Sequence, residues 1–176
     1  MGTDKYLFFG ANTADGFVGF FDQIAEMYSL KHLYILKGGS GIGKSTFIRK
    51  FAEAFATHNR DFLVCAGDPK SLDGVILPDL GIGIIDGTHP HPVDPIFPGV
   101  VDEIINLGEF IDKTRVTADK DTLKQLGKQK ANHYKQATAH LAWAREIHYQ
   151  IENFYKNAVD FDGVQKKLKQ IISKHT

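Results

Sequence analysis

A cluster of glycines followed by a lysine and a serine is the first feature of this sequence that could do chemistry. Residues 38–45 read Gly-Gly-Ser-Gly-Ile-Gly-Lys-Ser, and this spacing matches the Walker A pattern of a phosphate-binding loop. Glycines let the backbone turn its N–H groups inward around a phosphate, and no Cβ obstructs the approach. The predicted nucleotide-binding residues are Gly39, Ser40, Gly41, Ile42, Gly43, Lys44, Ser45 and Thr46.

The two polar side chains at the end of this motif have separate predicted roles. Lys44 would bridge the β- and γ-phosphate oxygens of a nucleotide, and the hydroxyl of Ser45 would ligate Mg²⁺. A helix that begins here would add the positive end of its dipole to the attraction. The alternative is a strand-to-helix turn that is merely rich in glycine, but an apolar run before the motif and a helical pattern after it favour phosphate binding.

Asp86 ends a second apolar run, residues 81–86, and an apolar strand that ends in an acid is typical of the Walker B motif. The carboxylate of Asp86 would hold the Mg²⁺ ion through a water molecule, and we count Asp86 with Lys44 among the catalytic candidates. Many buried strands end in aspartate, so this signal depends on the preceding glycine motif. Gly87 stands where many ATPases carry a catalytic glutamate, so the motif does not identify the base that would activate water.

Asp68 is the third catalytic candidate. It belongs to residues 67–74, which follow an apolar run and contain a second acid, Asp73. We expect this segment at the carboxyl edge of the sheet, where ligands bind in open α/β folds, and Asp68 could act there as a base or position water. The alternative is a simple turn, because Asp, Pro and Gly all favour turns.

The proline-rich loop after Asp86 contains two histidines and an acid, His89, His91 and Asp94. These side chains could contact phosphate or substrate. They could also form a zinc site, although two histidines and one acid are few ligands for zinc. The third possibility is a loop that the prolines hold rigid without any contact to a ligand.

The elements that must position these residues follow from the apolar pattern. Continuous apolar runs, expected for strands covered on both faces of a parallel sheet, predict strands at residues 6–9, 32–36, 61–66 and 81–86. Apolar residues at spacings of three and four predict helices over residues 16–30 and 44–58. This alternation predicts an α/β fold, specifically a P-loop NTPase three-layer sandwich with a mainly parallel sheet, plus a long α-helical arm.

Beyond the prolines the apolar residues recur close to every 3.5 positions, which predicts a helical arm. Residues 119–159 would form one long helix, or two helices broken near Gly127, and a final amphipathic helix would follow with Asp162 as its N-cap. Tyr134 lies on the apolar face and is predicted to pack in a core. The predicted domains are a P-loop core at 1–114, a helical arm or hairpin at 115–159 and a C-terminal helix at 160–176.

Composition excludes some classes of protein. The chain has 176 residues, 43% of them hydrophobic and 24% charged, as in an ordinary soluble domain. No apolar run is long enough to cross a bilayer and no signal peptide is recognisable, so we expect no membrane association and a cytoplasmic protein. Cys65, the single cysteine, excludes an internal disulfide and lies in an apolar run, which predicts a buried structural thiol.

Charge is divided unevenly along the chain. Residues 1–112 contain 8 Lys and Arg against 15 Asp and Glu, whereas residues 113–176 contain 13 against 6. The predicted arm is therefore basic and the body acidic. Only four arginines occur in the whole chain, and nucleic-acid binding would normally bring more arginine and exposed aromatic residues, so we expect no nucleic-acid partner.

Several motifs resemble those of a little-characterised group of bacterial P-loop ATPase-like proteins that usually have two tandem P-loop halves. The similarity covers roughly residues 5–115 and rests on the segments LKGGSGIGKST, DPKSLDGVILPDLGIGIIDGTHPHPVDP and FPGVVDEIINLGEFID, with FFGANTADGF similar to the start of each half. The resemblance implies ATP binding through Lys44 and Ser45 and participation of Asp68, Asp73 or Asp86. This chain resembles one half, which implies either a homodimer that replaces the second half or a truncated form.

These features favour a Mg-ATP-binding ATPase that couples its nucleotide state to the helical arm. One alternative is a small-molecule or nucleotide kinase, in which Asp68, Asp73, His89 and His91 would line an acceptor pocket and Arg115 would lie in a lid. Another is a non-enzymatic, nucleotide-gated interaction module. A GTPase is disfavoured because the sequence contains no N-K-x-D guanine motif.

The arm also predicts a partner. A helix of about forty residues would span roughly 60 Å at 1.5 Å per residue, longer than the sheet of one P-loop domain, so part of its apolar face would extend beyond the body. We therefore expect a homodimer or a protein partner to cover Leu141, Ala144, Ile147, Ile151 and Phe154.

Overall fold

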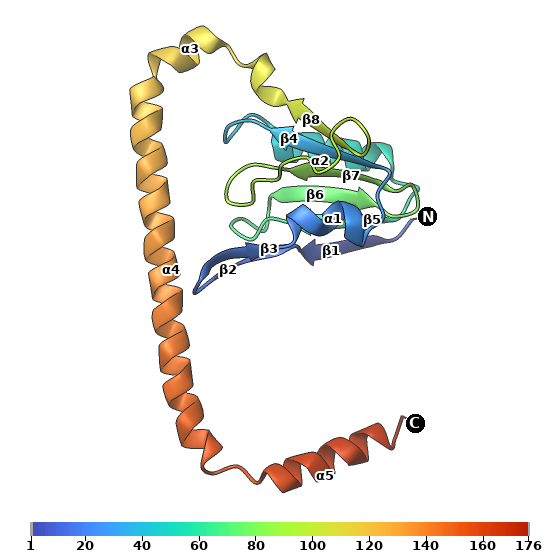
Figure 1. Cartoon of the computed structure of the whole chain (residues 1–176), viewed down its shortest axis with the longest axis vertical. Coiled ribbons are helices and arrows are strands. Elements are labelled where there is room, and N and C mark those ends of the chain that lie inside the picture. Colours follow the sequence, from blue (N-terminus) through green and yellow to red (C-terminus); the bar gives the residue numbers. More distant parts are fainter. Residues whose placement is uncertain (1, 176) are drawn as a thin grey trace.

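The computed structural model describes residues 2–175, which form an α/β structure with a mostly parallel six-stranded sheet and one long helix (Figure 1). The strands are β1 (Asp4–Phe8), β2 (Gly10–Thr13), β3 (Gly16–Gly19), β4 (His32–Lys37), β5 (Arg60–Val64), β6 (Leu72–Leu77), β7 (Ile82–Asp86) and β8 (Asp102–Asn106). The helices are α1 (Ile24–Met27), α2 (Lys44–Ala54), α3 (Lys113–Ala118), α4 (Lys120–Lys156) and α5 (Phe161–Ile172), with short 3-10 helices η1 (Phe21–Gln23) and η2 (Leu107–Phe110). The predicted α/β class is confirmed.

The sheet has the strand order β1-β5-β6-β7-β4-β8, and β2 and β3 form a separate hairpin. Neighbouring strands are parallel except at β6, which is antiparallel to both β5 and β7. The four predicted strands correspond to β1, β4, β5 and β7. Their carboxyl ends meet at one edge of the sheet, so the segments that follow them can build a common site there.

The sequence pattern does not predict β6 or β8. In β6, Asp73 and Gly74 suggest a turn, yet every residue of the strand is buried. Position 74 accepts only glycine without a shift of the backbone, because a Cβ there would lie 2.9 Å from the carbonyl oxygen of Ile84 in β7, closer than real Cβ atoms approach. The last three residues of the segment expected to be a loop, residues 67–74, therefore begin a central strand.

The helix predicted over residues 16–30 is wrong. The segment begins with β3, which pairs with β2 through the register Thr13↔Gly16 to Gly10↔Gly19. Gly16 has a φ of 102°, a turn conformation that glycine tolerates best, and the hydroxyl of Thr13 donates a hydrogen bond to the carbonyl of Gly16. Strand β3 therefore replaces the first four residues of the predicted helix, and only η1 and α1, residues 21–27, are helical.

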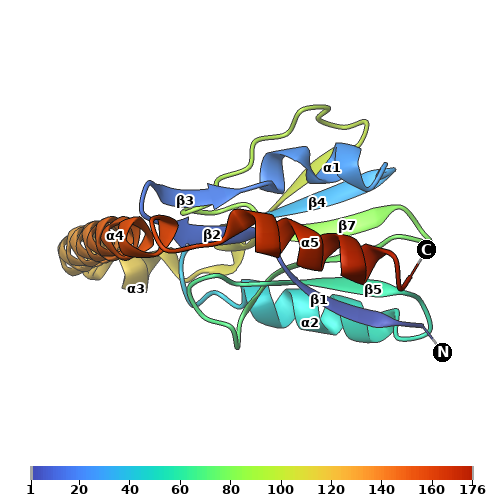
Figure 2. The ribbon, with the colours of Figure 1, turned by 90° about the horizontal axis from the view of Figure 1, so that it is seen from below.

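Both faces of the sheet are covered, by different means (Figure 2). Helix α2 covers one face, where Ile48 and Ala52 pack against strand residues such as Val75. On the opposite face, η1 and α1 contribute Phe21 and Ile24 to the second core cluster. The second covering layer is therefore short helical turns and loop rather than the full helix expected for a three-layer sandwich.

Helix α4 is continuous from Lys120 to Lys156 and is not broken at Gly127, so of the two predicted forms of the arm the single helix is correct. The helix crosses in front of the carboxyl ends of the parallel strands and continues beyond the sheet (Figure 1). It packs against β2, and Arg145 forms a 2.6 Å ion pair with Asp15 of the hairpin turn. The arm is therefore attached to the body through the hairpin that the sequence did not predict.

Helix α5 follows a short connection after α4 and has no buried residue. Its N-cap is Asp160, whose carboxylate accepts the N–H of Gly163 at 2.9 Å, and not the predicted Asp162, which lies in the first turn. Within residues 2–175, no helix combines the length and the apolar character that crossing a membrane requires.

Candidate functional site

The glycine-rich loop, residues 38–43, connects β4 to α2 and depends on glycine for its backbone path. Gly38, Gly41 and Gly43 have φ values of 144°, 83° and 93°, a region that other residues rarely adopt. A Cβ on Gly41 or Gly43 would meet no atom within 4 Å, so backbone conformation, not space, requires glycine at these positions. Gly43 is also the N-cap of α2, and the loop therefore ends at the positive end of this helix dipole.

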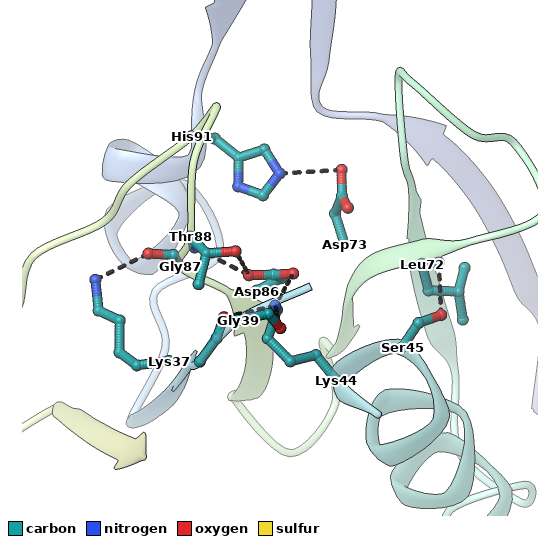
Figure 3. Close-up of polar contacts among 11 residues, drawn as sticks. Lys37, Gly39, Lys44, Ser45, Leu72, Asp73, Asp86, Gly87, Thr88 and His91 are labelled. Atoms are coloured by element: carbon teal, nitrogen blue, oxygen red, sulfur yellow. Dashed lines mark hydrogen bonds and ion pairs between the residues drawn. The ribbon is translucent and has the colours of Figure 1, made fainter. Parts of the chain in front are cut away.

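Lys44 is buried at the first position of α2, with 9% of its surface exposed. Its Nζ donates to the carbonyls of Gly38 at 2.9 Å and Gly39 at 3.0 Å, and lies 3.5 Å from Oδ2 of Asp86 (Figure 3). A buried ammonium is costly without partners. The loop carbonyls and the Asp86 carboxylate supply those partners and hold the charge of Lys44 against the loop.

Asp86 lies at the end of β7, beside β4, where it pairs in register with Leu36. Its Oδ1 accepts hydrogen bonds from the backbone N–H of Thr88 at 2.9 Å and from the Thr88 hydroxyl at 2.6 Å. One carboxylate oxygen therefore orders the loop after β7, and the other faces Lys44. The structure brings together two of the predicted catalytic residues.

The Ser45 hydroxyl accepts the N–H of Leu72 at 3.0 Å. This contact ties the first turn of α2 to the start of β6 and uses one of the two lone pairs of the hydroxyl oxygen. The second lone pair is available to a ligand. Among residues 2–175, no group of three or more His, Cys, Asp or Glu side chains is arranged to hold a metal ion.

A buried Asp73–His91 pair lies on another wall of the site (Figure 3). Nε2 of His91 is 3.2 Å from Oδ2 of Asp73, and the imidazole stacks on Phe21 with ring centroids 4.3 Å apart. Burial lowers the pKa of His91, but the hydrogen bond and charge of Asp73 and the charge of Asp86 raise it, and the net shift of the pKa is upward. Within the described chain, Nδ1 of His91 has no hydrogen-bond partner.

The remaining candidates lie apart from this pair. Asp68 is exposed, and its carboxylate accepts the N–H of Lys70 at 3.1 Å, as in a turn. The side chain of Asp94 is 97% exposed and 3.8 Å from Lys37, and Arg115 pairs with Asp112 in the exposed segment before α4. None of these three acidic or basic candidates lines the cleft described next.

A cleft of about 440 Å³ joins the glycine-rich loop to the Asp73–His91 pair. Its lining residues come from the glycine-rich loop, α2, the segment from the end of β5 to the start of β6, the end of β7 with the loop after it, and helix α4. They are Ser40, Gly41, Gly43, Lys44, Ser45, Thr46, Cys65, Ser71, Asp73, Asp86, Thr88, His89, Pro90, His91, Lys130 and Tyr134. Six of the eight predicted binding residues therefore line one cleft; Gly39 and Ile42 do not.

Three lining residues, Cys65, Lys130 and Tyr134, lie outside every segment that was predicted to form the site. Cys65 was expected to be a buried structural thiol, but β5 ends at Val64 and Cys65 lies partly exposed on the cleft wall. Its position after a strand could have indicated this. Lys130 and Tyr134 reach the cleft from α4, and no local pattern indicates that contact, because it depends on the direction in which the arm leaves the body.

Comparisons with known proteins do not identify a family. The chain matches no family model, no curated protein and no solved structure.

Proposed function

We propose that the cleft binds a nucleoside triphosphate with Mg²⁺, and that the protein is a P-loop ATPase. The observation that carries the proposal is the buried ammonium of Lys44, held between the carbonyls of the glycine-rich loop and Asp86 at the N-terminus of α2. The ammonium of Lys44 and the N-terminus of α2 lie at a cleft large enough for a small ligand. Polyphosphate is the ligand chemistry that this arrangement fits best.

Each group would have a defined role in binding. Backbone N–H groups of residues 39–45 would donate to phosphate oxygens, and Lys44 would exchange loop carbonyls for charged oxygens, a stronger hydrogen bond. Ser45 would use its free lone pair as a metal ligand, and Asp86 would hold a water on the same ion. When bound, Mg²⁺ supplies positive charge that offsets the negative charge on the phosphate oxygens.

The site contains no glutamate beside Asp86, since Gly87 follows it. A Cβ at Gly87 would collide with the side chain of Ile35, so a larger residue does not fit at this position. We therefore expect slow hydrolysis, well below the median enzyme turnover of about 10 per second. A second candidate function is phosphoryl transfer to a small acceptor, favoured by the buried Asp73–His91 pair on the cleft wall.

Calorimetric titration with ATP, GTP and ADP in the presence of Mg²⁺, followed by product analysis, tests the proposal. Saturable ATP binding with release of ADP and phosphate supports the ATPase. Phosphate found on an added acceptor supports the kinase, and binding without turnover supports a nucleotide-gated module. Absence of saturable binding of any nucleotide would contradict the proposal.

Asp86→Asn should reduce Mg²⁺-dependent turnover at least tenfold, on the order of 1.4 kcal/mol, while ATP affinity changes less. The asparagine oxygen can still accept from Thr88, so the loop after β7 keeps its order, but the negative charge that favours the metal is lost. Turnover and the Mg²⁺ dependence of ATP affinity are measured side by side. Asp94→Asn, which neutralises an exposed carboxylate outside the cleft, is the matched control, and equal effects of the two variants would contradict the role of Asp86.

Cys65 provides a chemical report of cleft occupancy, because it is the single cysteine and lines the cleft. Burial raises the pKa of its thiol, and only the thiolate reacts, so modification by Ellman's reagent should be slow at neutral pH and accelerate as pH rises. Saturating MgATP should slow this reaction at least about threefold, because bound nucleotide shields the cleft wall. An unchanged rate at a nucleotide concentration that calorimetry shows to be saturating would contradict binding in this cleft.

The partner that we propose for the arm is a second copy of the chain. Apolar side chains on the outer half of α4 remain exposed, including Ile147 at 58%, Ile151 at 49% and Phe154 at 82%. Exposed apolar surface of this extent commonly marks an interaction site. The basic segment 113–176 of one copy and the acidic segment 1–112 of another also carry complementary charge.

A further inference from the structure

Helix α4 forms part of the cleft wall, so residues of the arm line the proposed nucleotide site directly. Lys130 and Tyr134 are four residues apart and therefore on the same face of the helix, and both line the cleft that Lys44 and Ser45 line from α2. Tyr134 was expected to pack in a core, but it is 44% exposed. Its hydroxyl reaches the rim of the cleft beside Gly67, where a Cβ would lie 3.2 Å from the phenolic oxygen.

The position of α4 at the cleft is held by the hairpin β2–β3. Arg145 pairs with Asp15 at the hairpin turn, and the side-chain amide of Asn12 donates to the carbonyl of Ala66 at 3.1 Å. Ala66 directly follows Cys65 of the cleft wall. A continuous set of contacts therefore joins the arm, the hairpin and the rim of the cleft.

The charges on the described cleft lining are unevenly compensated. The ammonium of Lys44 faces Asp86, and Asp73 faces His91. Lys130, the other lysine on this lining, forms no ion pair with any residue in the range 2–175. Its charge is therefore available to an anionic ligand, and a polyphosphate in the cleft would carry several negative charges.

We propose that Lys130 and Tyr134 are nucleotide-binding residues, so that the bound triphosphate joins helix α4 to the glycine-rich loop. Lys130 pairs with phosphate oxygens, and Tyr134 packs its ring against the nucleoside. The inference rests on the proposed function, and it explains how nucleotide state reaches the arm. A bound nucleotide contacts α4 only when the arm lies at the cleft. Nucleotide binding therefore favours this position of the arm over positions in which α4 is away from the cleft.

Two probes separate the contributions of the two side chains. Lys130→Ala should weaken binding of both MgATP and inorganic tripolyphosphate at least fivefold, because its contact is to phosphate. Tyr134→Ala should weaken MgATP binding at least about threefold and leave tripolyphosphate binding unchanged, because its contact is to the nucleoside. Both positions are exposed on a helix where alanine is the best helix former, so the fold is retained.

Matched controls lie on the same helix. Lys128→Ala removes the same charge, and Tyr149→Ala removes the same ring, at exposed positions outside the cleft. Affinities of both controls should stay within about twofold of the parent. Hydrogen exchange should also slow in residues 120–145 of the parent when MgATP saturates it, and this protection should be lost in Lys130→Ala.

The outcomes distinguish this inference from the function on which it rests. If the parent binds MgATP and Lys44→Ala weakens it, but Lys130→Ala and Tyr134→Ala match their controls, the inference is overturned and the proposed function stands. If the parent binds neither MgATP nor tripolyphosphate, the proposed function fails and the inference fails with it. Weakening of both probes by Lys130→Ala and of MgATP alone by Tyr134→Ala supports it.

Discussion

Lys44→Ala should weaken MgATP binding by at least tenfold, which corresponds to about 1.4 kcal/mol, and should leave the fold intact. The ammonium lies at the N-terminus of α2, bonded to Gly38 and Gly39 and beside Asp86. Without it, the triphosphate loses its main charge-assisted contact and meets the Asp86 carboxylate uncompensated. Calorimetric titration measures the loss of affinity, and far-UV circular dichroism measures retention of the fold.

Asp86 limits the structural cost of this substitution. Its carboxylate keeps the two hydrogen bonds from Thr88 when the lysine is removed, so it is not left without partners. Lys50→Ala is the matched control, because Lys50 is an exposed lysine of the same helix outside the cleft. A Lys44→Ala protein that is folded and binds MgATP as tightly as Lys50→Ala would show that the glycine-rich loop is not a phosphate site.

The double variant Ile151→Glu, Phe154→Glu should convert a self-associated protein into a monomer. Both side chains are largely exposed, three residues apart on the outer half of α4, and two carboxylates on a face that is buried between copies would be desolvated without partners. Leu141 is a less suitable site, because it lies one turn before Arg145, which holds the arm to Asp15. Sedimentation velocity over a range of concentrations measures the change.

The matched control places the same two charges beside this face. Gln150→Glu, Asn153→Glu changes exposed polar positions and should leave the association unchanged. MgATP binding should persist in both double variants, since the glycine-rich loop lies in a different element. A parent chain that sediments as a monomer at all concentrations would contradict the homodimer and leave the exposed face of α4 to a different protein.

Much of the site could be predicted from local sequence, because the relevant interactions are local. The glycine-rich loop needs glycine at positive φ, and Lys44 and Ser45 follow it in the first turn of α2, so their spacing alone predicts their common location. Asp86 could be predicted because it ends a continuous apolar run, which indicates a buried parallel strand. The length of α4 follows from a long helical period without proline.

The errors arise where partners distant in the chain decide the structure. Residues 16–30 have helical spacing of apolar residues, but Gly16 and Gly19 pair with β2 and only residues 21–27 become helical. Likewise Asp73 and Gly74 suggest a turn. They become part of strand β6 because the segment pairs with β5 on one side and with β7 on the other. Local propensity is a weak determinant when the segment can gain ladder hydrogen bonds and burial from its neighbours.

By itself, the sequence determined the α/β class, the glycine-rich loop with Lys44, the strand that ends in Asp86 and the long uninterrupted helix of the arm. Each of these features depends on residues that are close together in the chain. Only the tertiary structure decided the pairing of Asp73 with His91, the position of Cys65 on the cleft wall and the approach of Lys130 and Tyr134 to the same cleft. These contacts depend on strand order and on the direction of α4, which packs against β2 and pairs Arg145 with Asp15, 130 positions away in the chain. A short-range pattern carries no information about such a contact, because its free energy is gained only after the intervening chain has folded.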